Sequence, residues 1–328
     1  MKKLVLLVNV IIASMFIQAC TDHVEPVAEP ETFTSQPFVS ELKYPIGLTV
    51  DDHSNVWVTE AGTGNNGTDG TVSMITSAGV KTTFVTGLQS LMREGSIEGI
   101  GHLIYKDGTL YFLHGSNGML YTADVSSFKS GDPAVKLADI PSQDLATFVK
   151  GENLTNPINS NTYDLTFGPD GHLYFVDSGS NAVIKRDKNN GKLSVFAKLP
   201  NVAPGVEAVP TGIVYDGSKL FISTLTGFPF APGSASILQV DDKGAVDVYQ
   251  SGFTTLTGIT LSANNKPIVI QHGEFGAKGF AKGSGLVLDG EGNTLFGNIT
   301  RPTDIMRAGD KMYYLLSYED GTIVKLSY

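Results

Sequence analysis

The 328-residue sequence predicts an all-β fold, a six-bladed β-propeller of four-stranded antiparallel blades, on three observations. First, glycine is abundant at 37 residues, and the apolar residues come in short runs separated by Gly, Asp and Asn, as in all-β chains. Second, a unit of four short strands recurs six times along the chain. Third, a segment near the N-terminus matches the strand that the last unit lacks.

The clearest copy of the repeated unit spans residues 163–199. In it "DLTF" and "HLYFVD" flank a Pro-Asp-Gly turn, while "AVIKRD" and "KLSVFAKL" flank an Asn-Asn-Gly turn, and both turns are typical of β-hairpins. Small or acidic residues recur at the matching position of each unit, at spacings of 54, 63, 48, 46 and 46 residues: Gly47, Gly101, Asp164, Gly212, Gly258 and Asp304. Four short strands at this period are typical of propeller blades.

Closure of the ring is predicted from the two ends of the repeat region. The sixth unit ends at "TIVKLSY" and lacks a fourth strand, whereas "FVSEL" at residues 38–42 matches "FVTGL" at 84–88, the fourth strand of the first unit. We therefore expect the N-terminal segment to complete the last blade and so protect its edge. This gives one propeller domain over residues 36–328.

The N-terminus predicts an exported lipoprotein. Lys2 and Lys3 precede an apolar run, and the run ends at Ala19 and Cys20, the single cysteine. The run is too short for a membrane span and is typical of a secretory signal. We predict a lipoprotein signal peptide at 1–19, lipidation of Cys20 and a Pro- and Glu-rich flexible tether at 20–35. An ordinary signal with an incidental cysteine is the alternative.

A lipoprotein signal predicts localisation in the bacterial cell envelope, with the protein lipid-anchored in the outer membrane and facing the periplasm or the surface. The net charge of −10, without a Lys/Arg cluster beyond the extreme N-terminus, argues against nucleic-acid binding. We expect a monomer whose contact with the membrane is its N-terminal lipid anchor.

The long connections are all predicted on one face. In a propeller the second-to-third loops and the blade crossings share a face, and here they are the long segments: "EAGTGNNGTDGT", "QSLMREGSIEG", "PSQDLATFVKGENLTNPINSN", "PNVAPGVEAVP", "LTGFPFAPGSA" and "QHGEFGAKGFAKGSG". The first-to-second and third-to-fourth turns are mostly tight. Because rigid scaffolds present function on loops, we expect a protein, glycan or small ligand on this long-loop face. Alternatively, these loops cover the channel mouth.

Polar residues at the ends of the second strands are candidates for binding, and so is the Phe- and Pro-rich loop of residues 225–235. The strand-end residues could instead cap their loops, and the loop could be a packing strut stiffened by its prolines. The predicted ligand-binding face comprises Glu60, His114, Asp177, Thr224, Phe228, Phe230 and Gln271.

Catalysis has no strong signature, because the chain contains no P-loop, G-x-S-x-G or H-E-x-x-H motif. A binding protein is therefore the first hypothesis, and a lactonase- or lyase-like enzyme is the alternative. The candidate acid/base groups are His114, His272, Glu60 and Glu274. No cofactor is predicted except a possible divalent cation at the channel, where Asp164 and Asp304 face each other across the ring. His102, on a first strand, is expected to be buried.

The repeat "GPDGHLYFVDSGSNAVIKRD" resembles NHL-type propeller repeats. The strings "EAGTGNNG", "VPTGI" and "LTGFPFAPGSASILQV", with the run "LADIPSQDLATFVKGENLTNPINSNTYDLTF", are similar to the ScyD/ScyE family over about residues 40–328. That resemblance implies an exported propeller without a defined reaction. Gluconolactonase-type propellers hold a divalent metal with Glu, Asn and Asp, but the nearest positions to their Asn and second acid are Tyr163 and Thr211 here. Neither is a convincing ligand.

Overall fold

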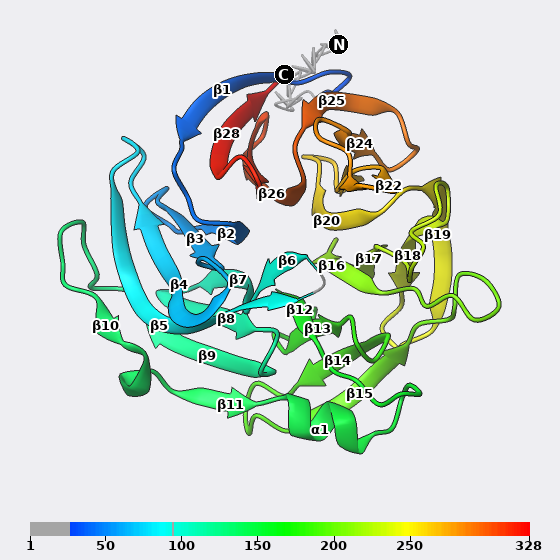
Figure 1. The fold of residues 1–328 in the computed structure, drawn as a ribbon, viewed down its shortest axis with the longest axis horizontal. Helices are drawn as coiled ribbons and strands as arrows, with labels where there is room; N and C mark the ends of the chain where they lie inside the picture. Colours follow the sequence, from blue (N-terminus) through cyan, green and yellow to red (C-terminus); the bar gives the residue numbers. More distant parts are fainter. Residues whose placement is uncertain (1–26, 94) are drawn as a thin grey trace, which may run out of the picture.

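The computed structural model describes residues 27–93 and 95–328. Six blades, each of four antiparallel strands, stand in a ring around a central channel, and each presents its edge strand to the axis (Figure 1). The short strand β10 (Val135–Lys136) adds a parallel pairing at the outer edge of the first blade. The predicted six-bladed β-propeller is confirmed. The signal peptide, Cys20 and the first part of the tether lie outside the described residues. Within the described part, no helix has the length and apolar character needed to cross a membrane.

Each blade contains four strands in order from the axis outward. In blade 1 they are β2 (Pro45–Val50), β3 (Val56–Glu60), β4 (Asn65–Ile75) and β5 (Lys81–Arg93). In blade 2 they are β7 (Ile100–Lys106), β8 (Thr109–His114), β9 (Met119–Asp124) and β11 (Ser142–Asp144). In blade 3 they are β12 (Thr162–Phe167), β13 (Leu173–Asp177), β14 (Ala182–Arg186) and β15 (Leu193–Lys198).

Blades 4 to 6 follow the same plan. Blade 4 contains β16 (Pro210–Tyr215), β17 (Leu220–Thr224), β18 (Ala235–Val240) and β19 (Val246–Phe253). Blade 5 contains β20 (Leu256–Leu261), β21 (Pro267–Gln271), β24 (Gly285–Asp289) and β25 (Thr294–Ile299). Blade 6 contains β26 (Pro302–Gly309), β27 (Met312–Ser317), β28 (Thr322–Ser327) and, as its outer strand, β1 (Thr34–Val39).

The N-terminal strand closes the ring as predicted, with a shifted position. β1 pairs antiparallel with β28, with Thr34 opposite Ser327, so the closing strand covers residues 34–39 rather than 38–42. The preceding residues also dock: Phe33 is buried, and its backbone N–H donates to the carbonyl of Leu295 over 2.8 Å. The docked part of the chain therefore extends beyond the predicted domain start at residue 36, because Phe33 packs its ring between blades 5 and 6.

A side chain joins each pair of neighbouring blades by donating a hydrogen bond to a backbone carbonyl. Thr211, Thr257 and Thr303 are the second residues of three inner strands, and their hydroxyls donate to the next blade at 2.8 to 3.0 Å. The other three donors are Thr59, His102 and Ser178. These bonds fix the inner strands around the axis, and buried apolar side chains fill the space between the blades.

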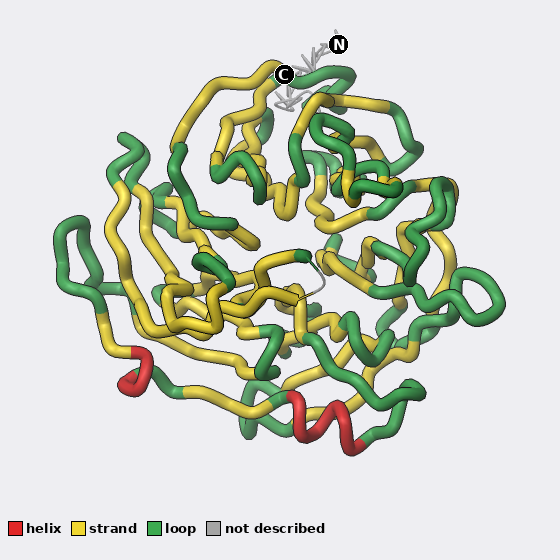
Figure 2. The backbone as a smooth tube through the Cα atoms, viewed as in Figure 1, coloured by secondary structure: helices red, strands yellow, loops and turns green. Residues whose placement is uncertain are grey.

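The additional elements lie mainly in the long connections. Figure 2 shows the helices among them in red at the outside of the strand ring. The segment predicted as a loop at residues 89–99 extends β5 and turns back as β6 (Ser96–Glu98). The helix α1 (Ala146–Gly151) follows β11, and β22 (Phe275–Gly276) pairs with β23 (Gly279–Phe280). One third-to-fourth connection is also long: in blade 2 it carries β10 (Val135–Lys136) and the 3-10 helix η1 (Leu137–Asp139).

Candidate functional site

A cavity of about 950 Å³ lies on the long-loop face, at the mouth of the central channel. Its floor is made by the first residues of the inner strands, among them Tyr163, Thr211, Thr257 and Thr303. Its walls come from the β5–β6 hairpin, from the β17–β18 and β21–β24 loops, and from the connections beside β26 and β28. The long loops therefore enclose a recess rather than only covering the channel.

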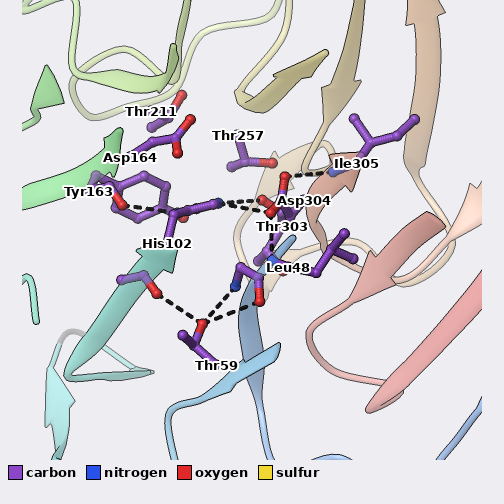
Figure 3. Close-up of polar contacts among 12 residues, drawn as sticks. Leu48, Thr59, His102, Tyr163, Asp164, Thr211, Thr257, Thr303, Asp304 and Ile305 are labelled. Carbon is purple, nitrogen blue, oxygen red and sulfur yellow. Dashed lines mark hydrogen bonds and ion pairs between the residues drawn. The ribbon is translucent and has the colours of Figure 1, made fainter. Parts of the chain in front are cut away.

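His102 extends from blade 2 between Tyr163 of blade 3 and Thr303 of blade 6, two residues of this floor (Figure 3). Its Nδ1 is 3.0 Å from the carbonyl oxygen of Tyr163, and its Nε2 is 3.2 Å from that of Thr303. Carbonyl oxygens only accept, so both ring nitrogens must carry hydrogens, which only the imidazolium form provides. Burial lowers the pKa of His102, but the carboxylates of Asp164 and Asp304 and these carbonyls outweigh burial and raise it.

Asp164 and Asp304 do not form a metal site of the expected kind. The carboxylate of Asp164 accepts the backbone N–H groups of Ile213 and Leu165 at 2.9 and 2.7 Å, so it links blade 3 to blade 4. Asp304 accepts the N–H groups of Leu48 and Ile305, both at 2.7 Å, and links blade 6 to blade 1. Burial raises the pKa of Asp164, and it raises that of Asp304 to about 6.

The cation that these two carboxylates face is the imidazolium of His102, whose Nε2 is 3.9 Å from Oδ2 of Asp304. In the described part of the chain, no group of three or more His, Cys, Asp or Glu side chains is arranged to hold a metal. A divalent cation at this position would be repelled by the positive charge of the His102 imidazolium. The residues present therefore do not fit a resident divalent cation here.

Four phenylalanines from two loops form one wall of the cavity, which we call the Phe wall: Phe228, Phe230, Phe275 and Phe280. The ring centroids of Phe230 and Phe275 are 5.0 Å apart, and those of Phe275 and Phe280 are also 5.0 Å apart. Phe228 lies at the lip with 75% of its surface exposed. The two phenylalanines predicted from the sequence thus line the mouth, and they pack against two that were not predicted.

Arg301 lies beside the Phe wall, directly before β26. Its guanidinium carbon is 5.5 Å from the ring centroid of Phe280 and 4.8 Å from that of Tyr318. Its Nε donates to Nε2 of His272 over 3.0 Å, and Nη2 donates to the Ser96 hydroxyl over 2.9 Å. Its backbone φ of 53° is in the left-handed region, which is uncommon for a residue of this size. The blade crossing therefore holds Arg301 in a strained conformation at the edge of the cavity.

His272 is the one acid/base candidate from the sequence that lines this cavity. Its Nδ1 donates to the carbonyl of Pro302 over 3.0 Å, and its Nε2 accepts from Arg301. Burial, with the Arg301 charge, lowers the pKa of His272 to about 3. The ring is therefore neutral at physiological pH, and its single lone pair is already occupied.

The other acid/base candidates lie away from the cavity lining. His114 is fully buried, and its Nε2 donates to the carbonyl of Gln89 over 3.0 Å while Nδ1 faces the Ser116 hydroxyl at 3.3 Å. Burial lowers the pKa of His114. Glu60 is buried against the Lys81 ammonium, with which it forms an ion pair. Glu274 is exposed, and its backbone N–H donates to the Ser284 hydroxyl.

The remaining strand-end candidates bond to nearby loops and to the neighbouring strand. Asp177 accepts from the Ser160 hydroxyl and from the backbone of Asn161 and Ser180 at 2.7 to 3.1 Å. Burial raises the pKa of Asp177, although these hydrogen bonds oppose the shift. Thr224 exchanges hydrogen bonds with the backbone of Ser236, and the Gln271 amide donates to the carbonyl of Ser284. These contacts are what the capping alternative predicts.

Arg301, Phe275, Phe280 and Tyr318 were not predicted from the sequence. A signal for two of them was present in "QHGEFGAKGF", where two phenylalanines lie in a long loop of the adjacent blade, as in "GFPF". Arg301 had no such signal, because a single basic residue before a strand is common.

Structure comparison finds other propellers. A streptogramin B lyase has a TM-score of 0.56 and 16% identity, over 92% of this chain and 99% of that chain. A gluconolactonase from Xanthomonas campestris has a TM-score of 0.58 and 11% identity, over 92% and 95% of the two chains. A PQQ-bound aldose sugar dehydrogenase from Streptomyces coelicolor has a TM-score of 0.52 and 15% identity, over 92% and 99%.

At these identities, the likeness shows the propeller fold alone. In sequence, no family model and no curated protein matches the chain.

Proposed function

We propose that this protein binds a small organic ligand in the cavity of the long-loop face. The observation that carries the proposal is the cavity itself, about 950 Å³, with the Phe wall on one side and Arg301 beside it. Small-molecule sites are recesses of roughly 300–1,000 Å³ with mostly apolar walls and a few polar groups. Of the three occupants that the sequence left open, a small ligand fits this recess best.

The exposure of Phe228 supports ligand contact over a purely structural role. A packing strut would hide its ring, whereas Phe228 keeps 75% of its surface in water. Covering roughly 100 Å² of such a ring contributes about 2.5 kcal/mol to binding. Phe230 and Phe275 hold the Phe228 ring from the protein side, with centroids 6.0 and 6.1 Å away.

A ligand-observed NMR screen of a library of small organic molecules tests this function. We expect hits whose signals are lost with the Phe230→Ala variant and kept with Phe38→Ala, a matched control because Phe38 packs on Tyr314 in blade 6, outside the cavity lining. A screen without hits, or hits that bind Phe230→Ala as well as the wild type, would overturn the proposal.

An enzyme acting in the same cavity is the second candidate. His272 lines the cavity, and propellers of similar fold include a protein named as a lyase and one named as a gluconolactonase. This candidate ranks second because Arg301 occupies the lone pair that a general base would need. Turnover of a lactone by the wild type, with or without added divalent cation, and its loss in His272→Ala would reverse the ranking.

The resemblance to the ScyD/ScyE family is also a proposal. Its support is the set of sequence strings in the loops, including the loop that carries Phe228 and Phe230, whose rings line the cavity. The family-specific loop and the candidate site thus coincide.

We further propose attachment to a bacterial envelope membrane through Cys20, with the cavity facing away from the lipid. The docked segment that follows supports this orientation. Asn264, in the β20–β21 turn opposite the cavity, donates to the carbonyl of Val27 over 2.7 Å and to Glu29 over 2.7 Å. The seven residues from Cys20 to Val27 span at most roughly 24 Å, so the lipid would lie near the tight-turn face.

Fractionation of cells that express the wild type or Cys20→Ser tests the anchor. We expect the wild type in the membrane fraction and the variant released from it. In liposomes that hold the acylated protein, energy transfer from labelled headgroups should be stronger to a dye at Asn265→Cys than at Lys278→Cys. These two exposed positions lie on opposite faces. Equal or reversed transfer would refute the orientation.

A further inference from the structure

We infer that the ligand of the cavity is an organic anion, with its anionic group on Arg301 and an apolar body on the Phe wall. This inference rests on the proposed function and specifies its ligand class.

The hydrogen-bonding capacity of Arg301 is only partly used. A guanidinium carries five N–H groups. One donates to His272 and one to Ser96, and within the described chain no acceptor takes the other three. His272 is neutral, so it satisfies a donor without balancing the charge. A carboxylate can take two parallel N–H groups of a guanidinium.

Within the described residues, the charge of Arg301 is likewise not neutralised by an ion pair. Among the ion pairs of the described residues, none joins a carboxylate to Arg301. Arg93, another cation of the lining, is paired with Glu98 at 3.6 Å. Lys278 and Glu319 also line the cavity, and both are exposed to water, where their fields are screened. Arg301 is therefore a half-buried positive charge of the lining without an ion-pair partner among the described residues, whereas the half-buried carboxylate of the lining, Glu98, is paired with Arg93.

The position of Phe280 joins the polar and apolar parts of the site. Its ring contacts Arg301 on one side, at 5.5 Å, and packs against Phe230 and Phe275 at 5.7 and 5.0 Å. A ligand whose anionic group meets Arg301 would thus place the atoms beyond that group over the Phe wall. An organic cation would meet Arg301 with like charge, and a neutral ligand would leave the three N–H groups without a charged partner.

Calorimetry with matched naphthalene compounds tests this inference. The probes are 2-naphthoate, 2-naphthylmethanol and 2-naphthylmethylamine, which share one ring system and differ in charge. We expect the acid to bind at least tenfold more tightly than the alcohol, and the amine most weakly. Arg301→Gln should reduce the preference for the acid to less than about threefold and leave the alcohol almost unchanged. Arg301→Lys should keep part of it.

Arg307→Gln is the matched control. Arg307 lies on β26, the strand that Arg301 directly precedes, but its Nη1 donates to the carbonyl of Ser262 in a turn of the opposite face, so its loss should change no affinity. An alcohol or amine that binds as well as the acid, or a preference for the acid that survives Arg301→Gln, would overturn the inference and leave cavity binding standing. If none of the three probes binds while the library screen gives hits that depend on Phe230, the ligand class is wrong. If that screen is also empty, the proposed function fails.

Discussion

The guanidinium of Arg301 donates a hydrogen bond to the ring of His272, 3.0 Å from Nε to Nε2. The other ring nitrogen of His272 donates to a carbonyl, so the residue is held as one neutral tautomer. Two groups that could each have acted on a ligand are thereby given different roles. His272 orients Arg301, and Arg301 keeps free N–H groups for the cavity.

The first prediction concerns acid stability. Burial and Arg301 lower the pKa of His272 to about 3, from a value of 6.5 in the unfolded chain. The unfolded chain therefore binds more protons between pH 3 and 6.5, and stability is lost as the pH falls through this window. When the pH falls from 7 to 4, the free energy of unfolding of His272→Gln should decrease by roughly 3 kcal/mol less than that of the wild type. Urea unfolding at both values measures this difference, with exposed His53→Gln as the control. Parallel losses in all three proteins would contradict the low pKa.

The second prediction concerns the charge of His102. The carboxylates of Asp164 and Asp304 and two carbonyls outweigh burial and raise its pKa above 6.5. Its contribution to stability is therefore complete below pH 6.5 and is lost as the pH rises through the folded-state pKa. Nitrogen-15 NMR of the imidazole rings should find the His102 ring still mostly protonated at pH 6.5, the ordinary pKa of a histidine. A neutral His102 ring at pH 6 would show that the interpretation of its two hydrogen bonds is wrong.

The third prediction tests the charge balance in the channel. His102→Ala leaves two buried carboxylates without their cation, and such a loss typically costs about 3–5 kcal/mol. Adding Asp304→Asn to this variant removes one of the two charges and should recover part of the loss, whereas Asp304→Asn alone should destabilise the protein. Chemical denaturation of the four proteins gives the coupling energy. Additive effects would mean that His102 and Asp304 do not interact.

The sequence predicted the propeller because hairpin turns and strand lengths are local properties, and these recur in every unit. The small residues that recur in the inner strands have a structural reason as well: a Cβ on Gly101 would lie 3.0 Å from the carbonyl oxygen of Tyr163 in the next blade. Close approach at the axis thus requires a small residue there. The closing strand was displaced by four residues because "FVSEL" and "FVTGL" match in composition, while the register follows from packing of Phe33 that the pattern does not encode.

The site was predicted less well, for a physical reason. Glu60, His114 and Asp177 were predicted as site residues because they are polar and end a strand. A buried polar group must be hydrogen-bonded or paired, and here nearby loops and neighbouring strands provide the partners. Arg301 and Phe280 belong to connections whose path depends on the assembled ring. Which side chains converge at the mouth follows from that path, and no strand periodicity reports it.

The fourth prediction separates stability from binding at Glu60. Glu60→Gln removes one partner of the buried ion pair with Lys81 and should lower the free energy of unfolding by about 2 kcal/mol, less than for a fully buried pair because the Lys81 side chain is 33% exposed. Affinity for any ligand found in the screen should stay within twofold of the wild type, because Glu60 does not line the cavity. A selective loss of affinity at unchanged stability would return Glu60 to the binding face.

The fifth prediction tests the docked N-terminal segment. The Phe33 ring lies edge-on to Tyr313 and Tyr328, with centroids 5.2 and 5.7 Å away, and is 7% exposed. Phe33→Ala should lower the free energy of unfolding by roughly 3 kcal/mol, because it leaves a void between blades 5 and 6 beside the strand that closes the ring. Val80→Ala, at an exposed turn, should change it by less than about 0.5 kcal/mol. Urea denaturation measures both variants, and limited proteolysis of Phe33→Ala should cut the chain before β1 faster than in the wild type. If Phe33→Ala is as stable and as resistant to proteolysis as Val80→Ala, residues 27–33 act as a plain tether, and the proposed orientation of the cavity away from the membrane loses its structural support.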